Sequence, residues 1–397
     1  HFPLTIRYAR NLGLDCMGMT GKFHTTWGDF SSFKNPAALE YECFMMLANG
    51  AKCSVGDQLH PEGEICQATY DLVGDVYSRV EAAEPWCRGA RPLTDIGVMT
   101  PEEFTGGSHG DLPEAAMGAV RMLQEGAQQF DIVDSHADLA RYKVLILPDA
   151  IEVNENLATK LSAYVDGGGA LLASHRSGLD PAGEKMAVQE FGVQLKGEAP
   201  YSPDFLTPEA EIGDGLAETG HVMYLRGVEV EAGSSAKVLA SVAVPCFNRT
   251  PEHFCSHNHT PSSGRLEYPG IVQNGRCIYF AHPVFTQYTQ NAPRWCKQLV
   301  LNALGRLLLE PLVQLDAPST ALATLNQQDE PARLVLHLLH YIPERRGARF
   351  DVLEDVIPLH DTGVSVRAPG PVSAVRCVPS GDEIPFELDE GRVRFVL

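Results

Sequence analysis

Apolar residues in the first 91 positions recur at two spacings, one typical of amphipathic helices and one of short buried strands. Asn35 precedes Pro36 and is suited to cap a helix, and Asn49-Gly50 is suited to end one. The pattern predicts a helix over residues 3–12, a strand over 15–20, a helix over 36–48, a strand over 51–55 and a helix over 68–84. The residues of both strands are mostly small or apolar, as in parallel strands that are covered on both faces. Two strand-helix units are too few to form a stable sheet or to close a barrel.

After Pro92 the sequence predicts a second and longer series of helices and strands. The pattern there predicts strands over 94–99, 130–133, 144–147, 170–173, 270–272 and 277–280, and helices over 113–129, 155–165 and 292–309. The alternation is typical of a doubly wound α/β domain of flavodoxin-like appearance. From Val238 onward the segment is richer in strands, and Asn274-Gly275 is suited to a tight turn between the last two.

Beyond Pro311 the pattern alternates with the period of strands, which predicts a small β-sandwich. Its strands are expected over 333–339, 363–366 and 374–378 and at the end of the chain. The last residues stop in mid-strand, and His1-Phe2-Pro3 opens directly into a helical pattern. We therefore expect this chain to be an internal piece of a longer protein.

Composition and charge exclude several classes of function. The formal net charge is -20, and nucleic acids and anionic membrane surfaces attract clustered Lys and Arg instead. No apolar stretch of the sequence reaches the length of a transmembrane helix. The 10 Cys form no Cys-x-x-Cys pair, and several fall singly inside expected strands and helices. This usage predicts reduced thiols in a cytoplasmic protein, with no zinc framework and no other metal site.

Polar side chains that could bind a ligand follow the first expected strand. Lys22, His24, Trp27 and Asp29 appear within eight positions, among residues too small to cover them. An ammonium, an imidazole, an indole and a carboxylate at the end of a buried strand suit a polar ligand with apolar faces, such as a sugar. The alternative is a polar loop with one core Trp, in which Asp29 caps a turn.

The second expected strand ends in a similar cluster. Asp57, Gln58 and His60 follow it directly and are predicted to bind the same ligand, unless they only form the entry to the next helix. Asp29 or Asp57 could also serve as an acid or base, although nothing local in the sequence indicates a raised pKa.

Several motifs together resemble a known group of glycoside hydrolases. The motifs are Gly21-Lys22-Phe23-His24-x-x-Trp27-Gly28-Asp29-Phe30, Asn35-Pro36-Ala37-Ala38-Leu39-Glu40, Gly56-Asp57-Gln58-Leu59-His60-Pro61 and Phe254-Cys255-Ser256-His257-Asn258-His259-Thr260-Pro261. They most resemble family 151 α-L-fucosidases. The domain order looks like that of family 42 β-galactosidases, in which a trimerisation domain of class I amidotransferase-like fold occupies the middle.

The resemblance implies a fold of three parts. Residues 1–91 would be the end of a (β/α)8 barrel, contributing its seventh and eighth strands. Residues 92–310 would be the trimerisation-type domain, which is amidotransferase-like and α/β, and residues 311–397 the β-sandwich. Such enzymes would assemble as homo-oligomers through the middle domain.

The resemblance also implies an activity, hydrolysis of terminal α-L-fucosyl residues of a carbohydrate with retention and without a cofactor. Family 42 enzymes have a Glu nucleophile at the end of the seventh strand, but no Glu precedes Glu40 here. This departure favours a fucosidase, whose Asp nucleophile would lie upstream of His1, and it predicts that the piece alone is inactive. The alternatives are a β-galactosidase-like glycosidase and a non-catalytic module for assembly or carbohydrate binding.

Two further segments of the middle region carry polar groups. His257 and His259 lie in a mostly polar loop, where they could hold a metal, form an inert surface or reach into a neighbouring subunit's barrel; the resemblance favours the last. Class I amidotransferases place a Cys at a sharp turn after a strand, but the corresponding stretch here, 172–178, has none. The loop with Gly106, Gly107 and Gly110 lacks a phosphate-binding motif. We therefore expect a structural middle domain.

Overall fold

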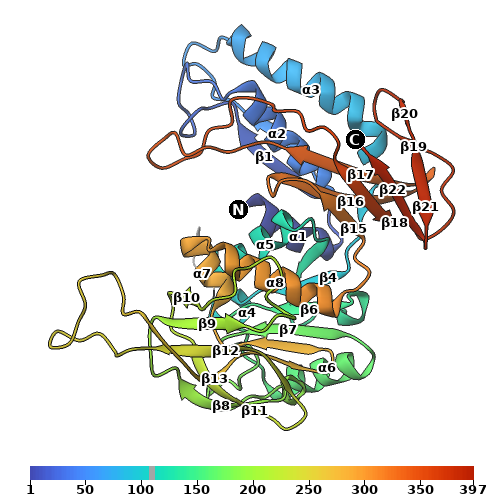
Figure 1. Ribbon diagram of the computed structural model, residues 1–397. Coiled ribbons are helices and arrows are strands. Elements are labelled where there is room, and N and C mark those ends of the chain that lie inside the picture. The colour runs from blue at the N-terminus through green and yellow to red at the C-terminus, as the bar shows by residue number, and fades with distance from the viewer. Residues whose placement is uncertain (107–111) are drawn as a thin grey trace. The chain divides into compact units, whose positions relative to one another are not determined.

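The computed structural model describes residues 1–106 and 112–397 and divides the chain into two compact units. The first unit contains His1–Thr94, Gln124–Gln129 and Glu310–Leu397, and the second contains Asp95–Leu123 and Phe130–Leu309 (Figure 1). The expected parts 1–91 and 311–397 thus share one unit. The division into three domains stays a prediction.

The first 91 residues of the first unit form the predicted alternation of helices and strands. Its elements are α1 (Phe2–Ala9), a 3-10 turn (Arg10–Leu12), β1 (Met17–Gly21), α2 (Pro36–Ala48), β2 (Lys52–Gly56) and α3 (Gln67–Cys87). The strands β1 and β2 pair in parallel, from Met17 opposite Lys52 to Gly21 opposite Gly56. The order of elements is confirmed; that these strands belong to a barrel stays a prediction.

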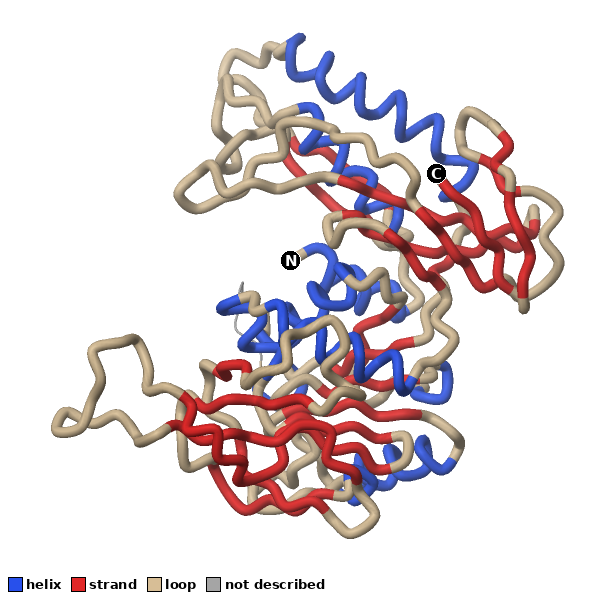
Figure 2. The backbone as a smooth tube through the Cα atoms, viewed as in Figure 1, coloured by secondary structure: helices blue, strands red, loops and turns tan. Residues whose placement is uncertain are grey.

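The rest of the first unit is built from antiparallel strands, which Figure 2 shows in red. They are β3 (Arg91–Pro92), β15 (Val313–Asp316), β16 (Ala321–Asp329), β17 (Ala332–His340), β18 (Gly363–Arg367), β19 (Val375–Arg376), β20 (Glu383–Ile384), β21 (Phe386–Asp389) and β22 (Arg392–Val396). Two sheets, β15-β18-β22-β21 and β17-β16-β3, contribute apolar side chains to one cluster, including Leu325 and Val364. The expected strand-rich region is confirmed, although the prediction omits β15, β16, β20 and β21; the sandwich description stays a prediction.

Buried amides on β16 join the strands to the helices of the first unit. The Nδ2 of Asn326 donates to the carbonyl of Ala48 at 3.1 Å, and the Nε2 of Gln328 donates to the carbonyl of Arg88 at 2.7 Å. Both side chains are almost completely buried. Because a buried amide without partners would be costly, these hydrogen bonds specify how β16 lies on α2 and α3.

The second unit surrounds one sheet of nine strands in the order β10-β9-β12-β13-β14-β7-β6-β4-β5. The strands of the sheet are β4 (Ile96–Met99), β5 (Phe130–Val133), β6 (Val144–Leu147), β7 (Ala170–Ser174), β9 (Asp204–Pro208), β10 (His221–Met223), β12 (Lys237–Pro245), β13 (Ser262–Asn274) and β14 (Cys277–Phe280). A separate pair consists of β8 (Val193–Glu198) and β11 (Val228–Ala232). The helices are α4 (Glu102–Thr105), α5 (Glu114–Glu125), α6 (Glu155–Asp166), α7 (Val284–Asn291) and α8 (Arg294–Leu307).

The sheet of the second unit is mixed. Strands β14, β7, β6, β4 and β5 pair in parallel, as expected of a doubly wound domain, whereas β10, β9, β12, β13 and β14 pair antiparallel. The doubly wound prediction is therefore correct for one half only. The hairpin around Asn274-Gly275 makes the change of direction, which is why the strand-rich pattern begins before it.

Two helix boundaries differ from the prediction for local reasons. The helix expected over 113–129 ends at Glu125, and Ala127 has a positive φ of 53°, which an α-helix cannot accommodate. The helix expected over 292–309 is α8 alone, preceded by a separate α7, because Ala292 has a φ of 46° and Pro293 restarts the helix. Gly107 and Gly110 of the glycine-rich loop lie outside the described residues.

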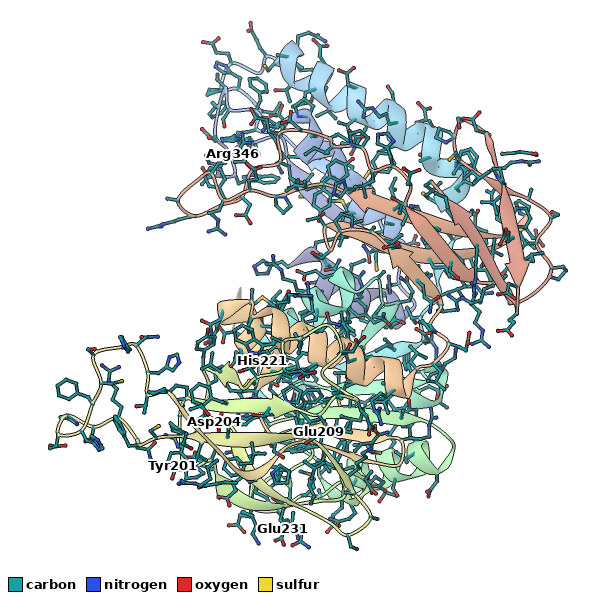
Figure 3. The ribbon with its side chains drawn as sticks, in the orientation of Figure 1. Tyr201, Asp204, Glu209, His221, Glu231 and Arg346 are labelled. Atoms are coloured by element: carbon teal, nitrogen blue, oxygen red, sulfur yellow. The ribbon has the colours of Figure 1, made fainter. Side chains whose placement is uncertain are left out.

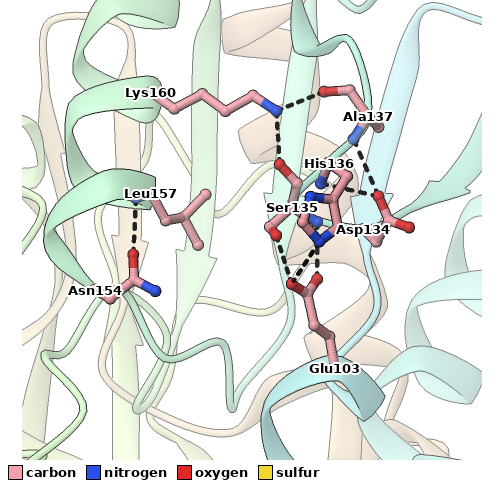
Figure 4. Close-up of polar contacts among 8 residues, drawn as sticks. All are labelled: Glu103, Asp134, Ser135, His136, Ala137, Asn154, Leu157 and Lys160. Atoms are coloured by element: carbon pink, nitrogen blue, oxygen red, sulfur yellow. Dashed lines mark hydrogen bonds and ion pairs between the residues drawn. The ribbon is translucent and has the colours of Figure 1, made fainter.

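The start of α6 and the loop after β5 are fixed by side-chain hydrogen bonds (Figure 4). The Oδ1 of Asn154 accepts from the backbone N–H of Leu157 at 2.9 Å, which caps α6. From the same helix, Lys160 donates to the carbonyls of Ser135 and Ala137 at 2.6 and 2.7 Å. These contacts hold the end of β5 against α6.

Across the described residues, no helix combines the length and the low polarity that a membrane crossing requires.

Two glycines in helices of the second unit allow a matched test of this packing. At Gly118 in α5, an added Cβ would lie 2.0 Å from the carbonyl oxygen of Phe285, whereas at Gly305 in α8 it would meet nothing within 4 Å. We expect Gly118→Ala to destabilise the protein by about 2 kcal/mol or more and Gly305→Ala to stabilise it by about 0.5 kcal/mol. Urea unfolding measures both; equal effects of the two substitutions would contradict the close packing of α5 on α7.

Candidate functional site

The site forms where β1 and β2 end side by side, at paired glycines. An added Cβ at Gly56 would lie 2.0 Å from Cη2 of Trp27, and one at Gly21 would lie 3.3 Å from its Cζ3. The indole therefore lies directly over both strand ends, in space that only glycine leaves free. It packs on Phe23 with ring centroids 5.2 Å apart, yet remains 59% exposed. Trp27 thus offers an aromatic surface to a ligand.

Lys22 contacts the same Phe23 ring as Trp27 and lies in partly aromatic surroundings. Its Nζ is 5.0 Å from the ring centroids of both Phe23 and Phe33 and 4.0 Å from Oδ1 of Asp57, and its side chain is only 4% exposed. The ammonium is held by two π faces and a carboxylate, which offset the cost of burying a charge. The contact also joins the end of β1 to the residue that follows β2.

The two candidate acids differ in their surroundings. The hydroxyls of Ser32 and Thr25 hydrogen bond to Asp29 and lower the pKa of its carboxyl; the bond from Thr25 is 2.8 Å long. A lowered pKa favours the carboxylate, so Asp29 is better suited to accept sugar hydroxyls than to act as a general acid. Asp57 accepts a hydrogen bond from the backbone N–H of Gln58 at 2.7 Å, in addition to its contact with Lys22.

The segments that follow β1 and β2 meet at further points. The ring of His60 contacts Phe30 edge-on at 6.1 Å, and Gln58 lies beside Gly28, where an added Cβ would be 3.8 Å from its Oε1. The structure therefore brings Lys22, Trp27, Asp57, Gln58 and His60 to one edge.

His24 turns to a different neighbour, Phe350, with ring centroids 5.4 Å apart and planes at 90°. Asn35 reaches the same loop and donates to the carbonyl of Leu353 at 3.1 Å. The sequence analysis does not identify Phe33 or Phe350. No local signal could have found Phe350, because it belongs to the connection between β17 and β18, far away in the chain.

The segment 246–261, which carries the two other predicted residues, connects β12 to β13 and extends away from the sheet (Figure 1). His257 is exposed, and its carbonyl accepts from Arg249 at 2.9 Å. His259 instead packs on Phe205, with ring centroids 5.9 Å apart, and its Nδ1 is buried without a hydrogen-bond partner. The structure therefore separates two residues that the sequence treats alike. In the described part of the chain, no three His, Cys, Asp or Glu side chains are grouped as metal ligands would be.

The turn after β7, where class I amidotransferases would place a Cys, contains no Cys and has one non-glycine residue with a positive φ. This residue is His175, with a φ of 52°, and burial, followed by the charges of His282 and Arg176, lowers the pKa of its imidazole to about 4. Ser177 is buried and accepts from the backbone N–H of Ile151 at 3.0 Å, so its hydroxyl has a structural role.

Asp149 and Asp204 are among the buried carboxyl groups of this unit, and Asp149 contacts the end of β7. Asp149 accepts from the hydroxyls of Ser174 and Thr286 at 2.6 and 2.7 Å, and burial raises the pKa of its carboxyl. Asp204, labelled in Figure 3, accepts from Tyr268 and lies 2.8 Å from Nε2 of His282. Both carboxyl groups are thus engaged in contacts between neighbouring elements of the second unit.

Part of the second unit resembles a domain of known proteins. Residues 121–197 match the β-galactosidase trimerisation domain. The trimerisation-type domain thus contains β5, β6, β7 and α6. A stretch of 75 residues, 19% of this chain, is 39% identical to the β-galactosidase Bga of Halorubrum lacusprofundi, and covers 10% of that protein.

Solved structures resemble the chain over its whole length. The α-L-fucosidase isoenzyme 2 of Paenibacillus thiaminolyticus is 40% identical, with a TM-score of 0.95, over 100% of this chain and 61% of that one. The family 42 β-galactosidase Gan42B of G. stearothermophilus matches with a TM-score of 0.66 at 13% identity, over 54% of its own length. This chain is therefore glycoside hydrolase-like, and it spans about three fifths of the fucosidase structure it resembles.

Trp27 permits a direct test of the site in the full-length protein. We expect Trp27→Ala to weaken binding of an iminosugar inhibitor by about 1 kcal/mol, because a stacking surface is lost. The melting temperature should change little, since the ring is largely exposed. Tyr70→Ala, which removes a comparably exposed ring from α3, serves as the control. Unchanged affinity measured by calorimetry would assign Trp27 to loop structure alone.

Proposed function

We propose that this chain is part of a glycoside hydrolase that removes terminal α-L-fucosyl residues. The observation that carries the proposal is the 40% identity to an α-L-fucosidase over the whole chain, with a TM-score of 0.95. The β-galactosidase structures match at 12–15% identity, a level that supports a common fold and no more. The carbohydrate is the substrate, and no cofactor takes part.

The residues at the ends of β1 and β2 bind the fucosyl group in this proposal. Trp27 stacks on the apolar sugar face that carries the methyl group, while His24, Asp29 and Asp57 bind hydroxyls. Lys22 fixes Asp57 from below. Hydrolysis with retention needs two carboxylic groups about 5–5.5 Å apart, and the end of β1 supplies no Glu. In this proposal the nucleophile is an Asp outside residues 1–397, as the resemblance to fucosidases implies, and Asp57 or a residue elsewhere is the acid.

An exposed surface of β1 supports the expectation of further barrel strands. Met17 and Met19 are 63% and 60% exposed, although parallel strands of this kind are ordinarily covered on both faces. Additional strands packed beside β1 would cover these side chains. We further propose that the complete protein is cytoplasmic and assembles as a homo-oligomer through its trimerisation-type domain.

A β-galactosidase-like activity is the second candidate, because the trimerisation-domain match and the 75-residue similarity both refer to β-galactosidases. A non-catalytic role in assembly or carbohydrate binding is the third. The fucosidase proposal is preferred because the similarity to the fucosidase extends over the whole chain.

Aryl glycosides distinguish these candidates. We expect the full-length protein to hydrolyse 4-nitrophenyl α-L-fucoside with a kcat/KM at least tenfold above that for 4-nitrophenyl β-D-galactoside. The chain 1–397 alone should show no turnover above a buffer blank, because it lacks the proposed nucleophile. Preference for the galactoside would favour the second candidate, and turnover by the chain alone would contradict the placement of the nucleophile.

The segment 246–261 is proposed to complete the site of a neighbouring subunit. The segment extends from the sheet (Figure 1), and the exposed His257 can donate to or accept from a hydroxyl. His259 packs on Phe205 and would support the shape of the segment. An incomplete set of carboxylates at the end of β1 leaves room for such a contribution.

We expect His257→Ala or His259→Ala to lower kcat/KM of the full-length enzyme by about tenfold, equivalent to about 1.4 kcal/mol, without changing its oligomeric state. His253→Ala is the control, because that ring stacks on Phe247 at 3.7 Å within the segment. Mixing a His257 variant with a variant lacking the nucleophile should restore activity through hybrid oligomers. Full activity of both His variants, or no complementation after subunit exchange, would contradict the proposal.

A further inference from the structure

The connection between β17 and β18, residues 341–362, contains a small hairpin. The backbone N–H of Glu344 donates to the carbonyl of Val352 at 3.0 Å, and that of Val352 donates to the carbonyl of Glu344 at 2.8 Å. Arg345 pairs with Asp351, and Arg346 pairs with Glu344. We refer to residues 344–352 as the arginine hairpin. Its shape is set by its own backbone and ion pairs.

The arginine hairpin and the residues around it contact the segment after β1 and the helix α2. Phe350 contacts the ring of His24, and the carbonyl of Leu353, just beyond the hairpin, accepts from Asn35. At the start of the connection, Tyr341 packs on Tyr41 of α2 with ring centroids 5.0 Å apart. Leu353 is only 8% exposed, which anchors the hairpin to the unit. A predicted site residue, His24, is therefore contacted by a residue from the far end of the chain.

Two of the three arginines in the arginine hairpin form ion pairs, and the third forms none with the described residues. Arg345 is paired with Asp351, and Arg346, labelled in Figure 3, is paired with Glu344 and Glu354. Arg349 is exposed and has no ion pair with any described residue. It directly precedes Phe350, the residue that contacts His24. A chain with a net charge of -20 thus presents an exposed guanidinium without an ion pair among the described residues, next in sequence to the residue that contacts His24.

We propose that the arginine hairpin forms the leaving-group side of the site: Phe350 positions His24, and Arg349 binds an anionic group, such as a carboxylate or sulfate, on the leaving group. This inference rests on the proposed fucosidase function and adds the chemical class of its preferred substrate. A guanidinium matches the planar geometry of a carboxylate through two parallel hydrogen bonds. The edge-on contact with Phe350 restricts the rotation of the imidazole, which otherwise lies exposed.

The role of Arg349 is tested with two aryl α-L-fucosides in the full-length enzyme, one with a 4-nitrophenyl and one with a 3-carboxy-4-nitrophenyl leaving group. We expect Arg349→Gln to lower kcat/KM for the carboxylate substrate by about fivefold and for the neutral substrate by less than twofold, as for an exposed ion pair. Arg376→Gln, which removes an exposed guanidinium paired with Glu383, should change neither.

The outcomes separate the inference from the function on which it rests. Wild-type enzyme that hydrolyses neither fucoside overturns the proposed function and this inference together. Turnover of both fucosides, with Arg349→Gln affecting both equally or neither, overturns the inference alone.

The positioning role of Phe350 is tested by a double-mutant cycle with His24. Phe350→Ala should lower kcat/KM for the neutral substrate by about threefold to tenfold, and Phe350→Tyr should keep most of the activity because it keeps the ring. In a His24→Ala background, Phe350→Ala should have less than a twofold further effect, since the residue acts through the imidazole. Independent, multiplicative losses from the two substitutions would overturn this role.

Discussion

The parallel pairing of β1 with β2 is the interaction on which the candidate site depends. Its register places Gly21 opposite Gly56, and the missing side chains leave the space that Trp27 fills. The same pairing brings Lys22 within 4.0 Å of Asp57. A shift of one residue would turn alternate side chains to the other face and place a bulkier residue under the indole. The aromatic surface, the buried ammonium and the carboxylate thus follow from one hydrogen-bonded register.

Buried polar contacts around the turn after β7 hold the trimerisation-type domain together. The backbone of this turn has a positive φ at His175. The nearby carboxylate of Asp149 is fully engaged by Ser174 and Thr286, and so joins β6, β7 and α7. The antiparallel half of the sheet supports the segment 246–261, whose exposed residues are available for contacts outside the domain.

The first unit combines segments from both ends of the chain because polar groups on one satisfy those on the other. Asn326 and Gln328 of β16 bond to carbonyls at the ends of α2 and α3, and Asn35 bonds to Leu353 across 318 positions of sequence. A side chain from the strand-rich region, Phe350, therefore reaches the site at the end of β1. The strand-rich region is part of the surroundings of the site as well as a support for the helices.

The sequence alone determined the order of helices and strands in residues 1–91, because apolar spacing and caps act over a few neighbouring residues. It also located the polar residues that follow β1 and β2, since parallel strands end at a common edge. Only the tertiary structure decided that Trp27 lies over Gly56, that Phe350 contacts His24, and that His257 is exposed while His259 packs inward. These contacts join segments far apart in the chain, and their geometry depends on packing that local propensity and periodicity do not encode.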